Sequence, residues 1–446
     1  MNSDPDEHVP DPALSGDEEM LAPQPAVRGG MALWALFLGF GMLMVGNGLN
    51  LAVLGVRVVD EGFGVRTSGY VMSSYFAGFL IGPTIISRLL STVGHIRVFA
   101  GLASLASGAV LIHSISVVPI TWALMRLVFG FCMAGLFIVL ESWLNDASTP
   151  TTRGRTLAVY MVVSMGGLAI GQLIIAFVDT AGYTLFILAS VLVSLAVVPV
   201  TLAATTEAPP VREAERLGLS ELYRTVPTGL VGMLFTGMSI GVLFGLGAVY
   251  AAGVGFSPGR LAAFLVLPTV GSLLMQWPIG LISDRLPRRG VIFVVALGAV
   301  AVCGVMAVLP SRSPLILVGM FLLGGMTFPL YSLLLTYTLD RSAPGKAIGA
   351  SSSLLRVNGA GAVIGPVIAS SFMGSTGPTA FFWALAVTHG VIVAYVGYRI
   401  VSADALPLER QGKFVALPAR STELAIRLTA RPLKASRAAL RRKKPD

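Results

Sequence analysis

The stretch Gly280-Leu281-Ile282-Ser283-Asp284-Arg285-Leu286-Pro287-Arg288-Arg289 decides the fold class of this chain. It closes an apolar run over residues 260–282 that is long enough to cross a bilayer, which takes about 20 residues. Gly280 permits close helix contact, and Asp284 can pair with a basic or helix-end partner in one conformation and release it in another. The alternative interpretation is ordinary anchoring of a helix end by the three arginines. In either case the stretch marks the end of a membrane-spanning helix.

The same kind of apolar run recurs along the whole chain. The longest polar break follows the sixth run, so the runs divide six and six. We therefore predict an all-α polytopic membrane protein with twelve transmembrane helices. The runs lie at 31–57, 68–90, 97–118, 120–144, 156–178, 183–203, 228–252, 260–282, 290–310, 314–338, 347–373 and 379–400. The predicted parts are an acidic N-terminal tail (1–30), a first half (31–203), a central loop (204–227), a second half (228–400) and a basic C-terminal tail (401–446).

Composition excludes several classes of protein. Apolar residues make up 55% of the 446 residues and charged residues only 12%, against about 25% in a soluble domain. Cys132 and Cys303 both lie in apolar runs, so neither a disulfide framework nor a metal cluster is expected. The sequence contains no phosphate-cradling Gly-Lys-Ser/Thr loop and no Gly-x-Ser-x-Gly elbow before a strand. We expect no enzyme, no cofactor and no ATP-driven pump.

The placement of charge predicts the orientation in the membrane. With the N-terminus inside, thirteen Lys and Arg fall on the cytoplasmic side up to residue 398 and only four fall outside. Both termini are therefore expected in the cytoplasm of a bacterium, with the chain in its inner membrane. Eleven of the 31 Lys and Arg follow Val401, which predicts contact with anionic lipid headgroups rather than with nucleic acid.

The two halves of the sequence echo each other. A shift of 194 residues places Gly167 and Gly171 on Gly361 and Gly365, so the fifth and eleventh runs share a fourfold glycine spacing. Weak internal symmetry of this kind is typical of transporters whose binding site lies between repeats.

The Gly280–Arg289 stretch resembles the loop signature of the major facilitator superfamily, with Pro287 where that signature usually has Gly. The copy in the first half is degenerate, because Ser87 stands where the acid is expected between Gly82 and Arg88. In the fourth run, Arg126 and Gly130 match the spacing of a second signature of the family.

A narrower resemblance covers most of the membrane region. Several short motifs together look like the YcaD-like permeases: Ser73–Gly78, Glu141-Ser142, Arg153–Arg155 with Leu157–Met161, Gly171-Gln172, Gln276–Gly280 and Gly365-Pro366. The resemblance implies two six-helix bundles around a central cavity, transport by alternating access, and a monomer. It supplies no substrate.

Three ionisable residues lie inside the predicted helices, where a charge is costly unless it is paired or hydrated. Arg126 is either a cavity cation for an anionic substrate group or a packing residue bonded to carbonyls. Glu141 is either a proton carrier or the acid of a gate with Arg153 or Arg155. Arg356 either faces the cavity or pairs with Asp340.

Polar side chains complete the candidate site. The candidates for the substrate cavity are Asn47, Asn50, Arg126, Gln172, Gln276, Arg356 and Asn358. Bonding between helices is the alternative use of the amides. The candidates for proton transfer or gating are Glu141, Asp284, Arg285, Asp340 and Arg341.

We therefore expect a secondary active transporter for a small organic solute, coupled to protons. A passive uniporter and a non-transporting membrane sensor on the same fold are the alternatives. The direction of transport stays open, because Gln172 after Gly171 leaves the antiporter-type glycine-proline motif incomplete.

Overall fold

The computed structural model describes residues 30–149, 151–203, 218–342, 346–404, 406–414 and 416. The acidic N-terminal tail, most of the central loop and nearly all of the basic C-terminal tail lie outside these residues. Within them, twelve helical segments are long and apolar enough to span a membrane, which confirms the predicted fold class.

Ten of the spans are single helices, and the fifth is α5 continued by the 3-10 turn η1 (Ile174–Ala176). The sixth is built from α6 and α7, which meet at Ala196. A short helix inside the predicted central loop, α8, precedes the seventh span. The helices are α1 (Gly30–Asp60), α2 (Val65–Val93), α3 (His95–Ile115), α4 (Pro119–Asp146), α5 (Arg153–Leu173), α6 (Thr184–Leu195), α7 (Val197–Ala203), α8 (Leu219–Thr225), α9 (Pro227–Gly253), α10 (Pro258–Arg285), α11 (Arg288–Val308), α12 (Leu315–Arg341), α13 (Ala347–Thr376) and α14 (Ala380–Ser402).

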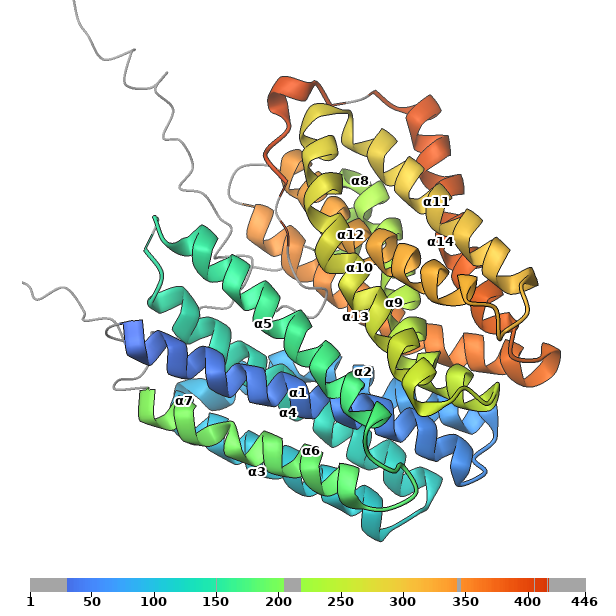
Figure 1. The fold of residues 1–446 in the computed structure, drawn as a ribbon. Helices are drawn as coiled ribbons and strands as arrows, with labels where there is room; N and C mark the ends of the chain where they lie inside the picture. Colours follow the sequence, from blue (N-terminus) through green and yellow to red (C-terminus); the bar gives the residue numbers. More distant parts are fainter. Residues whose placement is uncertain are drawn as a thin grey trace, which may run out of the picture.

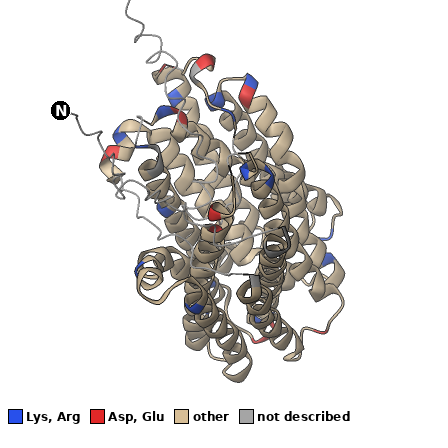
Figure 2. Cartoon of the chain, turned by 90° about the vertical axis from the view of Figure 1, so that its left-hand side faces the viewer, with Lys and Arg blue, Asp and Glu red and all other residues tan. Residues whose placement is uncertain are grey.

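Figure 1 shows two bundles, α1–α7 and α9–α14, that touch at one end of the molecule and diverge toward the other. We call the end where α1 begins and α14 ends the tail side, and the opposite end the far side. Most of the helix surface in Figure 2 belongs to uncharged residues, and the charged ones gather toward helix ends and loops. This distribution fits helices whose middle parts lie in hydrocarbon.

The first helix of each bundle ends in the same way. Gly62 (φ +70°) and Gly255 (φ +72°) adopt left-handed backbone conformations that only glycine takes without strain. The amide of Phe63 donates to the carbonyl of Val58, and the amide of Phe256 donates to that of Ala251. Both are Schellman caps, which turn the chain sharply toward the next helix.

Close glycine contacts join four pairs of helices. In each pair, one glycine on each helix faces a backbone carbonyl of its partner, so that a Cβ atom there would collide with main chain. These glycines are Gly48 and Gly171 in α1–α5, Gly78 and Gly130 in α2–α4, Gly237 and Gly361 in α9–α13, and Gly271 and Gly324 in α10–α12. The two bundles therefore use equivalent pairs, and the echo between the fifth and eleventh runs has a packing cause.

Contacts between the bundles lie from the middle of the helices to the far side. The Ser73 hydroxyl of α2 donates to the Val363 carbonyl of α13 at 2.5 Å. Nearer the far side, Gly69 of α2 packs on Ser370 of α13, and Gly55 of α1 packs on Ala248 of α9. These contacts close the far side of the molecule.

The glycine contacts generate a stability prediction. Gly78→Leu should destabilise the N-terminal bundle by about 1–3 kcal/mol or more, because the new side chain meets the main chain of α4. Thermal unfolding of the detergent-purified protein measures the effect. The matched control is Gly101→Leu in α3, where a Cβ atom has nothing within 4 Å. An equal fall in unfolding temperature for both variants would contradict the role of Gly78 in the contact between α2 and α4.

Candidate functional site

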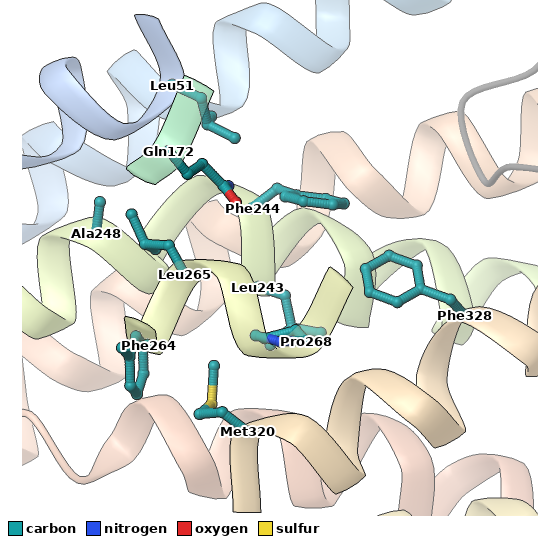
Figure 3. A pocket seen from close by; sticks show the side chains of 10 residues that line it. All are labelled: Leu51, Gln172, Leu243, Phe244, Ala248, Phe264, Leu265, Pro268, Met320 and Phe328. Carbon is teal, nitrogen blue, oxygen red and sulfur yellow. The ribbon is translucent and has the colours of Figure 1, made fainter. Parts of the chain in front are cut away.

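A narrow pocket lies between the two bundles in the far half of the molecule (Figure 3). Leu51 of α1 and Gln172 of α5 form its wall on one side, and α9, α10 and α12 supply the remainder, including Phe264 and Phe328. Nine of its ten lining residues are apolar, and Gln172 is the exception. In this conformation the pocket has a volume of only about 10 Å³, which is room for about one water molecule. It thus offers an apolar surface with one amide that helix movement must widen before a solute fits.

Gln172 is 1% exposed, and its amide end points toward Phe244 in Figure 3. Its Oε1 atom has no hydrogen-bond partner among the described residues. Leaving a buried acceptor unpaired costs about 1–3 kcal/mol. An acceptor kept in this way at the junction of two bundles is suited to a donor group on a ligand.

A second polar centre lies nearer the tail side. Tyr160 of α5 donates its hydroxyl to Oε1 of Glu141 of α4 at 2.5 Å, and both residues are fully buried. The Tyr160 ring stacks on Phe40 of α1, with centroids 5.1 Å apart. Tyr331 of α12, in the other bundle, lies near Tyr160. Glu141 is therefore held within the N-terminal bundle by Tyr160, close to the boundary with the other bundle.

In this conformation neither cation considered for Glu141 is bonded to it. Arg155 is exposed and Arg153 is half-buried, at the tail-side start of α5. Tyr160 takes the position of partner instead.

Arg126 lies inside the N-terminal bundle. It is fully buried, and its guanidinium carbon lies 4.8 Å from the centroid of the Tyr75 ring of α2. It also interacts electrostatically with His113 of α3. Arg126 and Glu141 lie on one helix, about 22 Å apart at 1.5 Å per residue, as their spacing predicts.

The remaining amides fall into two groups. Gln276 donates to the Ser332 hydroxyl at 2.9 Å, and Asn358 donates to the Met233 carbonyl at 3.1 Å, both between helices of the C-terminal bundle. Asn47 and Asn50 of α1 are buried and hold side-chain atoms that have no hydrogen-bond partner among the described residues. Asn47 and Asn50 thus resemble Gln172 in keeping unused hydrogen-bonding capacity.

The two acids of the C-terminal bundle meet on one arginine. Arg288, whose side chain is 1% exposed, forms an ion pair with Asp340 and lies 3.5 Å from Asp284. The alternative pairing of Asp340 with Arg356 is not what the structure shows. Arg356 is half-buried in the tail-side part of α13.

The chain beyond α14 folds back onto these acids. Gly412 donates its amide to Asp340 at 2.8 Å, and Phe414 donates its amide to Asp284 at 2.6 Å. The Phe414 ring packs on Gly280 of the opening stretch. We call residues 406–414 the C-terminal strap, because they tie the tail-side ends of α10, α11 and α12 together (Figure 1).

The other two gate candidates lie beside the strap. Arg285 is exposed at the end of α10. Arg341 lies over the Tyr337 ring at 5.1 Å and donates to the Asp404 carbonyl at 3.1 Å.

Sequence reasoning did not assign roles to Tyr160, Tyr331 or Phe414. For the two tyrosines, the available signal is their position inside apolar helices, because a buried hydroxyl group needs a hydrogen-bond partner. The described residues contain no group of three or more His, Cys, Asp or Glu placed to hold a metal ion.

The ion pair under the strap generates a second prediction. Asp340→Asn should destabilise the protein by about 3–5 kcal/mol, because it leaves the buried Arg288 without its charged partner. The control is Glu221→Gln, which removes the exposed pair with Lys346 and should cost about 1 kcal/mol or less. Thermal unfolding in detergent compares the two, and a loss no larger for Asp340→Asn than for Glu221→Gln would contradict the role of the pair.

Solved structures share the fold described above. A nucleoside transporter, NupG, superposes with a TM-score of 0.67 at 13% identity, over 84% of this chain and 99% of that one. A bacterial homologue of the human lysosomal transporter Spinster, in an inward-facing and unoccupied conformation, gives 0.63 at 15% identity, over 90% and 98%. At these identities the likeness shows the fold alone.

Proteins of similar sequence identify the family. An uncharacterized MFS-type transporter of Yersinia pestis is 29% identical over 314 residues, covering 68% of this chain and 79% of the relative. The MFS-type transporter YcaD of Escherichia fergusonii is 27% identical over 350 residues, covering 74% and 88%. Residues 36–358 match the family described as Major Facilitator Superfamily. With its twelve spans and its bacterial relatives, the chain is a multi-pass inner-membrane transporter, not an enzyme, and it belongs to the Major Facilitator Superfamily.

Proposed function

We propose that this chain is a secondary active transporter that moves a small organic solute by alternating access and uses protons as the coupling ion. The observation that carries the proposal is the pocket between the bundles, where Gln172 keeps a buried amide oxygen unpaired. A site between two bundles is exposed to one side or the other when the bundles rock.

The closed far side supports a direction for this conformation. The bundles touch from mid-helix to the far side at Ser73–Val363, Gly69–Ser370 and Gly55–Ala248. They diverge toward the tail side (Figure 1). The excess of Lys and Arg on tail-side loops supports a cytoplasmic position for that side. The conformation is then the inward-facing one.

The lining of the pocket supports one class of solute. Nine apolar side chains favour an uncharged solute with a flat or branched apolar body, and Gln172 favours a hydrogen-bond donor on it. The buried amides of Asn47 and Asn50 are further hydrogen-bonding groups that helix movement can bring into use. Nucleosides belong in the first set of compounds to test, because the nucleoside transporter NupG has a similar fold.

Glu141 supports coupling to protons. A carboxyl group inside the membrane-spanning region gains or loses a full charge on titration, and that charge changes the stability of its surroundings. Its partner Tyr160 lies at the boundary with Tyr331 of the other bundle. Protonation of Glu141 therefore acts where the bundles meet. Passive uniport is the alternative if solute movement ignores the proton gradient.

The pocket is tested first by ligand binding. A set of uncharged solutes is screened by thermal shift on the purified protein, because a compound that binds the folded state raises its unfolding temperature. For a compound found in this way, Gln172→Leu should weaken binding about tenfold, which corresponds to 1.4 kcal/mol. The same variant should keep or raise the unfolding temperature of the ligand-free protein, because it removes an unpaired buried acceptor.

The matched control is Gln276→Leu. This amide is also buried, but it bonds Ser332 within one bundle, so its loss should lower the unfolding temperature and leave ligand affinity unchanged. If Gln276→Leu weakened binding as much as Gln172→Leu, the pocket would not be the site.

Proton coupling is tested by flux. In proteoliposomes, an imposed pH gradient should drive accumulation of the compound by the wild type. Glu141→Gln should reduce gradient-driven accumulation at least tenfold, because the side chain at position 141 then stays uncharged. The variant should retain the exchange of solute for solute.

The control variant is Glu221→Gln, which removes an exposed carboxylate at the tail side. This variant should accumulate solute as the wild type does. Wild-type flux that does not respond to the gradient would refute proton coupling and favour uniport.

A further inference from the structure

Three arginines gather around one tyrosine at the tail side of the C-terminal bundle. The guanidinium carbons of Arg289 and Arg341 lie 5.9 Å and 5.1 Å from the centroid of the Tyr337 ring. Nε of Arg289 donates to the Tyr337 hydroxyl at 3.0 Å. Arg399 of α14 interacts electrostatically with Arg341. The cluster thus joins the ends of α11, α12 and α14, and we call these three residues the arginine cluster.

The cluster is not balanced by carboxylates among the described residues. Asp340, which interacts with Arg341, and Asp284 are both bound to Arg288 and to the strap. Asp404 contributes its backbone carbonyl to Arg341. None of the three arginines forms an ion pair within the described part of the chain. Three like charges at close range repel one another, so an anion bound there would be stabilising.

A pocket lies against this cluster. Its lining consists of Pro287, Arg288, Arg289, Tyr337, Asp340 and Arg341 on the helix side and of Leu406 and Gln411 of the strap. The one carboxylate in this lining, Asp340, is paired with Arg288, so Arg289 and Arg341 leave the pocket with a net positive charge. Arg289 is 5% exposed, and its Nη2 has no hydrogen-bond partner among the described residues. Nε of Arg341 is unpaired in the same sense. Buried guanidinium donors with unused capacity mark an anion site.

We propose that this pocket binds a phosphate group, as the phosphodiester of an anionic lipid headgroup or as free phosphate. The planar donor forks of two arginines match phosphate oxygens, whereas a carboxylate would use fewer of the donors. The pocket lies where the spans end, at the depth of lipid headgroups, and basic pockets between helices at this depth bind such headgroups. The strap forms its outer wall, so binding and strap position depend on each other.

The proposal does not depend on the substrate or on proton coupling. The test uses the full-length protein in nanodiscs of phosphatidylcholine alone, or of phosphatidylcholine with one fifth phosphatidylglycerol. The anionic lipid should raise the unfolding temperature, and Arg341→Gln should remove at least half of that rise. Arg97→Gln, an exposed arginine at the tail side of the other bundle, should keep the full rise.

A second arm identifies the source of the phosphate. In neutral detergent, inorganic phosphate is compared with chloride at equal ionic strength. A rise with phosphate that Arg341→Gln abolishes would assign the pocket to a soluble phosphate compound. A rise with lipid alone would assign it to a headgroup.

Arg399→Gln covers the case in which Arg341→Gln does not fold. It removes one charge of the cluster and leaves the Arg399 carbonyl, which accepts from Arg289, in place. If neither lipid nor phosphate raises the unfolding temperature, or if Arg97→Gln loses as much of the rise as the cluster variants, the proposal is wrong.

Discussion

The close approach of paired helices through glycine is the constraint on which the rest of this structure depends. In lipid, no hydrophobic force draws helices together, so packing distance and complementary surfaces must do so. Four pairs, α1–α5, α2–α4, α9–α13 and α10–α12, meet with glycine against the partner's main chain. Each bundle is thereby held internally. The boundary between bundles is left to fewer contacts, concentrated from mid-helix to the far side. Strong internal packing and a weaker boundary are what allow two bundles to rock as rigid bodies.

The few charged groups inside the spans follow the same division. Arg126 is enclosed by the N-terminal bundle, with Tyr75 beneath its guanidinium, and Arg288 is enclosed at the end of the C-terminal bundle by Asp284 and Asp340. Each is a local solution to the cost of a buried charge. Glu141 differs, because its tyrosine partner lies at the boundary between the bundles. Its surroundings are therefore expected to change when the bundles move relative to one another.

The sequence predicts those features that depend on periodicity and composition. Twelve spans follow from twelve apolar runs, and the matched glycines of α5 and α13 follow from a 194-residue shift. The partners of polar residues do not follow, because they lie on other helices. Nothing in the sequence distinguishes Gln172, which lines a pocket, from Gln276, which bonds Ser332. Phe414 is a lone aromatic in a polar segment, and only the fold brings it to Gly280. The spacing of residues predicts which side chains share one face of a helix, whereas the site is built from side chains of several helices.

The positions of the two polar centres constrain how coupling works. Tyr160 and Gln172 are twelve residues apart on α5, which is about 18 Å along the helix axis. A solute that bonds Gln172 therefore does not touch Glu141, and direct exchange of a proton between them is excluded by distance. On α12, however, Phe328 lines the pocket and Tyr331 follows it by three residues, within one helical turn. Movement of α12 relative to α5 would change the pocket wall and the surroundings of Tyr160 together. We infer that solute and proton act on one another through the relative position of these two helices. Coupling of this indirect kind requires only that each ligand favours one arrangement of the bundles over the other.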